Sequence, residues 1–92
     1  MNNNITTTLI NIINQVTINN MKMVDNIVSG SNMVKVKTCK GINYHTAIKA
    51  VYTVATKYIN NKANVTMFDN STIVIHKTIG NNYKPITWIR IK

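Results

Sequence analysis

The sequence contains no glutamate, and its only acidic residues are Asp25 and Asp69. Eleven lysine and arginine residues give the 92-residue chain a formal net charge of +9. An AT-rich genome would favour Asn, Ile and Lys, but it would not remove Asp and Glu. A surface of one sign attracts polyanions by steering and by releasing counterions from phosphates. The charge therefore favours nucleic acid as the partner, and the alternative is a basic protein that binds nothing anionic.

Cysteine, glycine and long apolar runs are also scarce. Cys39 is the only cysteine, which excludes an internal disulfide framework. Three glycines in all form no Gly-rich phosphate loop. No apolar run approaches the roughly 18–20 residues of a membrane span. The N-terminal stretch MNNNITTT lacks the basic and apolar regions of a signal peptide. We therefore expect a protein that is not secreted and not in a membrane, located in the cytoplasm or on the nucleoid or chromosome.

Chemistry-bearing residues are too few for a convincing catalytic or metal site. Cys39, His45 and His76 are the only soft metal ligands, and they lack paired zinc spacing. Cys39 and His45 flank a corner and could form a nucleophile pair, but an orienting acid is hard to find. We expect no metal, no cofactor, no small-molecule substrate and no enzymatic activity.

The apolar fraction of 45% is that of a globular core. Residues 1–7 are polar and are expected to be disordered, followed by one domain over residues 8–92. A domain of this size buries little more than half of its unfolded surface, which favours a homodimer.

Periodicity predicts the elements of the first half. Residues 8–14 are apolar and β-rich, typical of a strand. A helix is predicted next, because apolar residues recur at a spacing of three and four. These residues are Met21, Val24, Ile27 and Val28. Asn19 or Asn20 would cap this helix, and the cluster at 30–32 would end it.

The rest of the chain alternates more clearly. Residues 33–39 predict a strand, and Lys40-Gly41 a corner. Residues 44–59 carry a continuous apolar stripe typical of a helix, which Asn43 would cap. The remaining segments read as a strand broken by a turn or bulge at 69–71, a polar tip and a last strand. They are residues 64–68, 72–79, 80–85 and 86–92. The prediction is an α/β fold of the two-layer α+β type, in the order β-α-β-α-β-β. It has a mixed four-stranded sheet with two helices packed on one face.

Three stretches carry a resemblance to a known family: MKMVDNIVSGSNMVKVKT, TCKGINYHTAIKAVYTVATKYI and YKPITWIRIK. In this order they resemble the Alba family, small chromatin and RNA-binding proteins of archaea with relatives in eukaryotes. The resemblance covers almost the whole chain and implies the same β-α-β-α-β-β order, a homodimer and binding of DNA or RNA. The five residues between Gly41 and Ala47, and an uncharged loop NQVTINN, depart from the family's pattern.

The first candidate site is the basic corner. Lys35 and Lys37 share one face of a strand, and Lys40 follows them, so three ammonium groups within about 20 Å could follow a phosphate backbone. The resemblance implies that Lys40, before Gly41, contacts nucleic acid. The alternative is an ordinary solvated strand face.

The second candidate site is the hairpin near the C-terminal end. Its residues are Lys77, Asn81, Asn82, Tyr83, Lys84 and Arg90. The resemblance implies that such hairpin arms reach along nucleic acid. Tyr83 would stack on an unpaired base or pack on the neighbouring sheet.

The sequence predicts binding of DNA or RNA through phosphates, with little sequence preference, since no base-reading recognition helix is present. The alternative is a protein-binding module, such as a ribonucleoprotein subunit or a viral or mobile-element factor, that targets an acidic partner. Such a module would use Tyr52, Trp88 and the lysines.

Overall fold

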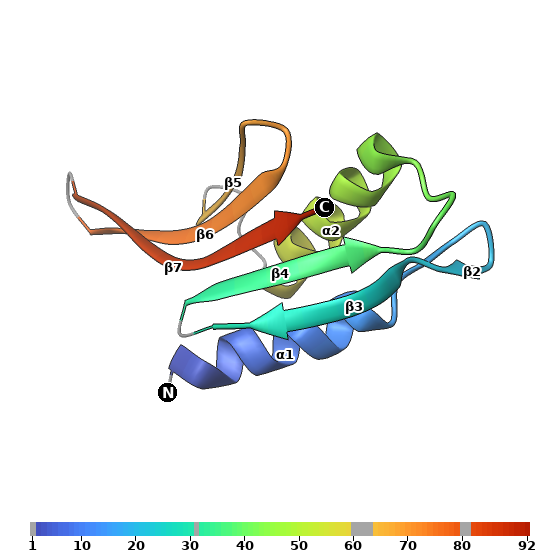
Figure 1. Cartoon of the computed structure of the whole chain (residues 1–92). Coiled ribbons are helices and arrows are strands. Elements are labelled where there is room, and N and C mark those ends of the chain that lie inside the picture. Colours follow the sequence, from blue (N-terminus) through green and yellow to red (C-terminus); the bar gives the residue numbers. More distant parts are fainter. Residues whose placement is uncertain (1, 31, 60–63, 80–81) are drawn as a thin grey trace.

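The computed structural model describes residues 2–30, 32–59, 64–79 and 82–92 (Figure 1). The chain has two helices and seven strands over these residues, of which two strands are very short. In chain order they are α1 (Asn2–Asn14), β1 (Thr17–Ile18), β2 (Met21–Lys22), β3 (Val24–Ser29), β4 (Met33–Thr38), α2 (Tyr44–Ile59), β5 (Val65–Phe68), β6 (Thr72–Ile79) and β7 (Asn82–Ile91). Neither described helix is long and apolar enough to cross a membrane.

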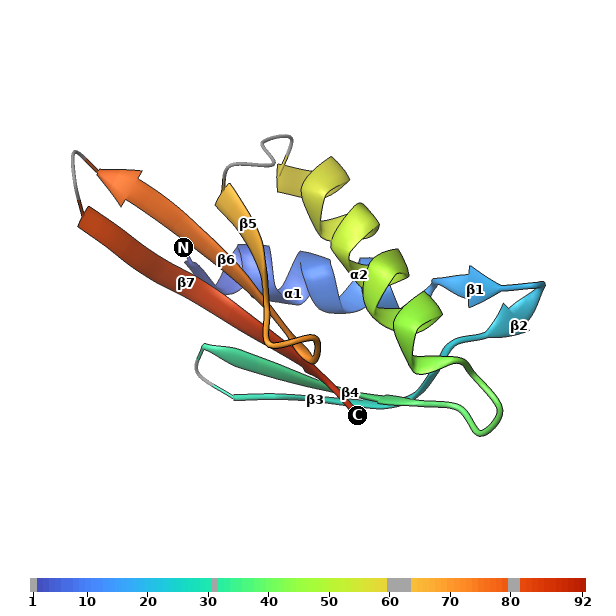
Figure 2. The same cartoon turned by 90° about the horizontal axis from the view of Figure 1, so that it is seen from above.

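Five strands form one mixed sheet in the order β3-β4-β7-β6-β5. All neighbours in it are antiparallel except β4 and β7, which run parallel. Strands β1 and β2 form a separate short ribbon. Both helices lie on the same side of β3 and β4, as the view from above shows (Figure 2). The expected two-layer α+β architecture is therefore confirmed, whereas the sheet has five strands and not the expected four.

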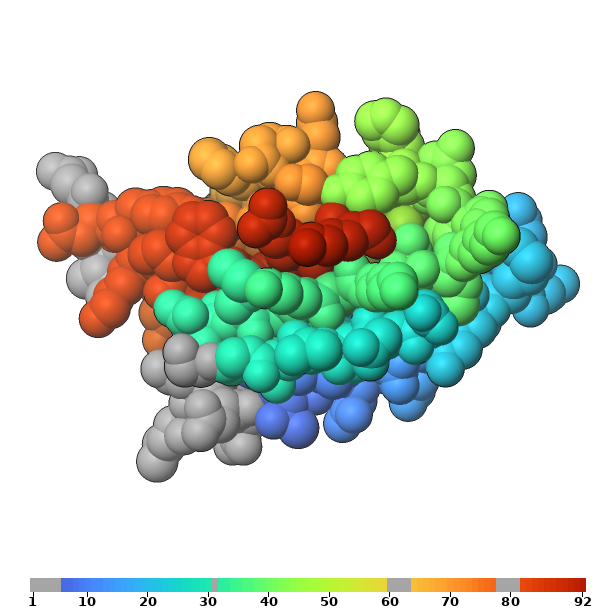
Figure 3. All heavy atoms as spheres, viewed as in Figure 1, coloured from blue at the N-terminus to red at the C-terminus, as the bar shows by residue number. Residues whose placement is uncertain are grey.

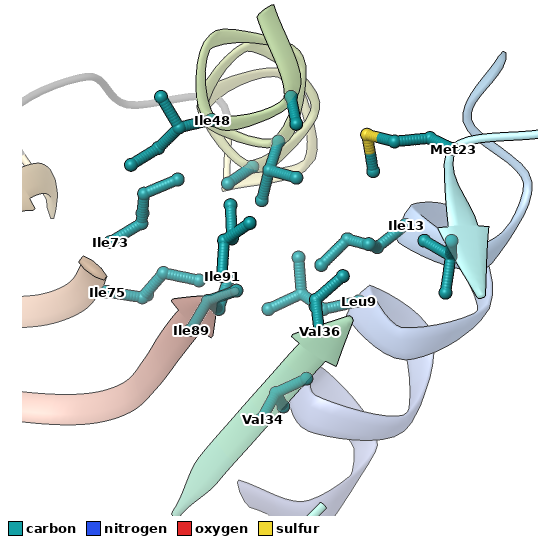
Figure 4. Close-up of a cluster of buried hydrophobic side chains, with 14 of the residues drawn as sticks. Leu9, Ile13, Met23, Val34, Val36, Ile48, Ile73, Ile75, Ile89 and Ile91 are labelled. Atoms are coloured by element: carbon teal, nitrogen blue, oxygen red, sulfur yellow. The ribbon is translucent and has the colours of Figure 1, made fainter. Parts of the chain in front are cut away.

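The core fills the space between the helices and the sheet (Figure 4). Leu9 and Ile13 from α1 and Ile48 from α2 meet side chains of β4, β6 and β7, among them Val36 and Ile89. These side chains are 0–2% exposed. Strands β4 and β7 therefore turn one face into the core, and on their other face Lys35, Lys37 and Arg90 are exposed to solvent.

Several expected elements are confirmed. Strand β4 alternates as predicted, with Val34 and Val36 buried and Lys35 and Lys37 exposed. Asn43 caps α2, since its Oδ1 accepts a hydrogen bond from the Thr46 backbone N–H at 3.1 Å. The segment 69–71 forms the turn between two separate strands, β5 and β6. Strand β7 begins at Asn82, so residues 82–85, predicted as part of a polar tip, belong to the strand and that boundary is wrong.

The strand predicted for residues 8–14 is wrong, because they belong to helix α1. Residues 2–7, which were expected to be disordered, lie in the same helix. The Ile and Thr content favours a strand, but Leu9 and Ile13 are spaced one helical turn apart and both are fully buried. Packing of this face against α2 and β3 overrides the weak local preference for a strand.

The helix predicted to follow Asn19 and Asn20 is also wrong. Both asparagines have positive φ, 53° and 65°, and form the tight turn between β1 and β2 instead of a helix cap. In β3 the register with β4 shifts between Val24 and Asn26. This irregularity adds one residue to the alternation, so Val24 and Ile27 both reach the core at a spacing of three. The bulge in β3 therefore gives its apolar residues the same spacing that a helix would have.

These corrections change the order of elements. The chain begins with a helix, followed by strands, and only then by α2. The β-α-β-α-β-β order implied by the Alba resemblance does not describe residues 2–29.

A tyrosine ties α2 to the end of β7. The Tyr44 hydroxyl donates a hydrogen bond to the backbone carbonyl of Ile91 at 2.6 Å. We expect Tyr44→Phe to lower the free energy of unfolding by about 1 kcal/mol, because the carbonyl loses this partner. Urea unfolding followed by circular dichroism measures the change. Tyr58→Phe, on the exposed part of the same helix, is the matched control; an equal loss in both variants would mean that the bond to β7 contributes nothing.

Candidate nucleic-acid interface

The face of the sheet that points away from the helices, here called the open face, carries the candidate site. Figure 3 shows that β3, β4 and β7 reach the molecular surface on this side, with no helix in front of them. Side chains alternate between the two faces of a strand. The buried Val34, Val36, Ile89 and Ile91 therefore place their neighbours on the open face.

Four cations of the open face form two neighbouring pairs. Lys35 lies opposite Arg90 in the parallel register of β4 and β7. The Lys92 backbone N–H donates to the carbonyl of Val36 at 2.8 Å, and its carbonyl accepts from Thr38 at 3.2 Å. These two bonds flank Lys37 and place Lys92 beside it. At a strand spacing of about 4.8 Å and a rise of about 3.3 Å per residue, the four side chains start within one small rectangle. We call them the cation cluster.

A shallow groove runs beside the cluster. A hollow of about 350 Å³ is lined by Asn26 and Val28 from β3, by Lys35 and Lys37 from β4, and by Lys92. A second hollow of about 240 Å³ shares Val28 and Lys35 with the first and continues toward Gly30. The lysines therefore stand along an open depression and not on a flat surface.

Neither acidic residue is a cross-strand neighbour of the cluster. Asp69 lies in the turn between β5 and β6, where its Oδ1 accepts hydrogen bonds from Ser71 N–H at 3.3 Å and from Ser71 Oγ at 2.7 Å. Asp25 lies at the irregularity of β3, where the partner of Lys37 is Asn26. Like charges directly opposite each other destabilise a sheet by a few tenths of a kcal/mol to about 1 kcal/mol. Because neither acid is a cross-strand neighbour of these cations, their mutual repulsion is reduced only by solvent or by a bound anion.

The predicted corner lies at the same end of β4. Gly41 has a φ of 88°, which side chains rarely adopt, and this explains why glycine stands at this turn. Lys40 is exposed and lies two residues after the end of β4, beyond Lys37. The structure thus brings the predicted Lys35, Lys37 and Arg90 together and leaves Lys40 in the adjoining loop.

The hairpin residues divide between the two faces of the β6–β7 arm. Lys77 and Lys84 are cross-strand partners and both are exposed. Tyr83 precedes Lys84 in the strand and therefore points to the opposite face. Asn82 is exposed at the start of β7, and Asn81 lies outside the described residues. The hairpin is therefore a second pair of like charges, separated from the cation cluster.

Sequence reasoning missed part of the site. Lys92 belongs to the cluster, which only the β4–β7 register reveals. Two aromatic pairs were also missed. Phe68 meets Trp88 edge-on, with ring centroids 6.3 Å apart, and His76 lies against Tyr83 at 4.4 Å. The apolar periodicity of β5 and β6 gave no signal for these pairs, because they join three strands.

Cys39 is a free, half-buried thiol, and His45 is exposed. In the described part of the chain no three His, Cys, Asp or Glu residues gather as metal ligands would. Tyr52, expected on the surface of the alternative protein-binding module, is partly buried and packs against the core.

The cluster makes a prediction for stability. Lys35→Glu converts a repulsive cross-strand pair with Arg90 into an attractive one. We expect the free energy of unfolding to rise by about 0.5–1 kcal/mol at low salt, with the gain shrinking as salt is added. Urea titrations at two salt concentrations measure it. Lys49→Glu on the exposed side of α2 changes the net charge equally; if it stabilises as much, the effect comes from total charge and not from the pair.

Comparison of the chain with protein-family models, with curated proteins and with solved structures found no match.

Proposed function

We propose that this protein binds nucleic acid without catalysis and with little sequence preference, through the cation cluster on the open face. The observation that carries the proposal is the pairing of Lys35 with Arg90, and of Lys37 with Lys92, with no acid as a cross-strand neighbour. Such an arrangement costs stability in the free protein and favours a ligand that brings several negative charges at short spacing. A phosphate backbone has this property.

The binding mechanism is electrostatic. Lysine and arginine side chains replace cations condensed on the phosphates, and the released ions supply the free energy. Lys40, in the loop that adjoins β4, extends the positive surface beyond Lys37. The exposed pair Lys77 and Lys84 on the hairpin lies on the opposite face from Tyr83 and adds positive charge there. These contacts fix position and orientation but read no bases, so sequence preference stays weak.

The proposal rests on charge and register and not on the Alba resemblance, because the N-terminal elements differ from the order that the resemblance implies. A homodimer, and a location in the cytoplasm or on the nucleoid or chromosome, belong to the same proposal. Light scattering after gel filtration tests the dimer: a mass of twice 10.4 kDa supports it, and the monomer mass contradicts it.

Salt dependence is the direct test of the proposal. We expect the logarithm of the association constant to fall with the logarithm of the salt concentration with a slope of about −3 to −4, if four phosphates are neutralised. Fluorescence anisotropy of a labelled oligonucleotide measures it. Lys35→Gln combined with Arg90→Gln should reduce the slope by about two. A midpoint that barely moves with salt would overturn the proposal.

An acidic protein partner is the competing function, and it needs a separate measurement. Polyglutamate of matched charge is added to the preformed complex with nucleic acid. If phosphate geometry matters, polyglutamate displaces the oligonucleotide only at a large excess of charge. Displacement at charge equivalence would favour the acidic protein partner.

A further inference from the structure

Two aromatic pairs stand on the same face of the sheet as the cation cluster. Cross-strand partners lie on the same face of a sheet. On β7, Trp88 and Arg90 are two residues apart and both lie on the open face. Thr72 of β6 lies between Arg90 and Phe68, with both as direct partners. Phe68 is therefore on the open face, and its edge-on contact with Trp88 agrees with this.

The second pair is connected to the first through β5. Thr66 lies opposite Val74, which in turn lies opposite Trp88. The Thr66 hydroxyl is hydrogen bonded to Nε2 of His76 at 2.8 Å, and the His76 ring lies against that of Tyr83. His76 is only 5% exposed, so it supports Tyr83 from below.

The outer rings remain accessible to a ligand. Phe68 and Tyr83 are each 54% exposed, although both already contact another ring. Large aromatic side chains held in place by a partner, and still half open to solvent, are suited to stacking on a planar ligand. Every nucleic-acid base has such a planar face, but a base in a duplex offers it to its neighbours in the stack.

Strand β7 joins the aromatic and the cationic part in one line. The register with β6 shifts between Ile75 and His76, which adds one residue to β7 and brings Tyr83 to the same face as Trp88. Arg90 and finally Lys92 follow on this open face. At about 3.3 Å per residue this line is roughly 30 Å long, enough for a single-stranded site of several nucleotides. The cations at one end of the line can contact phosphates, and the aromatic rings at the other end can stack on unpaired bases.

We propose that the open face binds single-stranded nucleic acid, with bases stacked on Phe68 and Tyr83 and phosphates on the cation cluster. This inference rests on the proposed function and adds that unpaired bases are part of what is recognised. The protein should therefore prefer a single strand over a duplex of the same sequence at equal phosphate concentration. RNA and DNA single strands share the chemistry, and parallel titrations with each distinguish them.

The protein itself carries a reporter. Trp88 is the only tryptophan, and it touches Phe68 at the centre of the aromatic region. Titration of the unmodified protein with oligothymidylate should quench or shift the Trp88 fluorescence, whereas inorganic polyphosphate, which has charge but no bases, should leave it nearly unchanged. Equal responses to both would overturn the inference.

Variants complete the test. Phe68→Ala and Tyr83→Ala should each weaken single-strand binding by roughly 5- to 100-fold, as expected for one lost base stack, and change duplex binding by less than about twofold. Tyr83→Phe keeps the ring and should bind like the unmodified protein, which separates stacking from a folding defect. Tyr58→Ala, an exposed tyrosine of α2, is the matched control.

The outcomes separate the two proposals. If the aromatic variants bind single strands as well as the unmodified protein, the stacking inference fails and phosphate binding stands. The stacking inference also fails if these variants lose single strands and duplex equally. If no nucleic acid binds in a salt-dependent way, both proposals fail.

Discussion

Replacing both Lys35 and Arg90 by glutamate is expected to lower the affinity for nucleic acid by roughly a hundredfold or more at low salt. The two side chains face each other across β4 and β7, so the substitution turns the centre of the cation cluster negative. Each charge-assisted contact to a phosphate contributes about 1.5–3 kcal/mol, and reversal adds repulsion to the loss. Anisotropy titrations of single-stranded and duplex oligonucleotides measure the change.

The control has the same net charge. Lys49→Glu combined with Lys57→Glu places the two reversals on exposed positions of α2, on the other side of the sheet. This variant should lose only the affinity that depends on total charge, several times less than the cluster variant. If both double variants weaken binding equally, the protein attracts nucleic acid by overall charge and the open face has no special role. Because the cluster variant keeps a like-charge pair, its stability should stay near that of the unmodified protein.

Leu9→Ala is expected to have the largest effect on stability. Leu9 of α1 is fully buried and belongs to the same core cluster as Val36 of β4 (Figure 4). Truncation of a buried leucine leaves a cavity and lowers the free energy of unfolding by about 2–5 kcal/mol. A domain of this size has only about 5–15 kcal/mol in total, so a large share of the molecules would be unfolded near body temperature. Thermal and urea unfolding measure the loss.

Asn11→Ala provides the comparison in the same helix, because Asn11 is exposed. It should change the free energy of unfolding by less than about 0.5 kcal/mol. A pair of variants with equal, small effects would show that α1 does not contribute its apolar face to the core, and the helical assignment of residues 2–14 would have to be revised.

The elements that could be predicted keep one regular spacing of apolar residues along their whole length. Strand β4 alternates strictly between valine and lysine, and α2 combines a continuous apolar stripe with a capping asparagine. Here local preference and burial agree, so the pattern alone determines the element.

The N-terminal third could not be predicted, because local preference and packing disagree there. In α1 the residues Ile10 and Thr8 prefer strands, but a helix buries Leu9 and Ile13 together. In β3 the bulge after Val24 spaces the core-facing residues three apart instead of two. From the sequence alone this spacing predicts a helix. The first outcome depends on contacts of α1 with α2 and β3, and the second on the pairing of β3 with β4.

The candidate site was predictable only as separate pieces. The lysines of β4 and Arg90 were identified from alternation and charge, but their pairing needs the parallel register of β4 and β7. No local pattern specifies which strand of a sheet lies next to which, because this follows from the path of the whole chain. The role of Lys92 and the grouping of Phe68 with Trp88 depend on the same register.

The central place of β7 in the sheet has a consequence for folding during synthesis. Strands β3 and β4 form one hairpin and β5 and β6 another, and only β7 joins them. A two-stranded hairpin is marginally stable in water by itself. While residues 82–91 are still inside the ribosome, both hairpins have open edges, and the chain must remain largely unfolded. The sheet can form only after translation has passed β7, so a delay at this step would expose strand edges to aggregation.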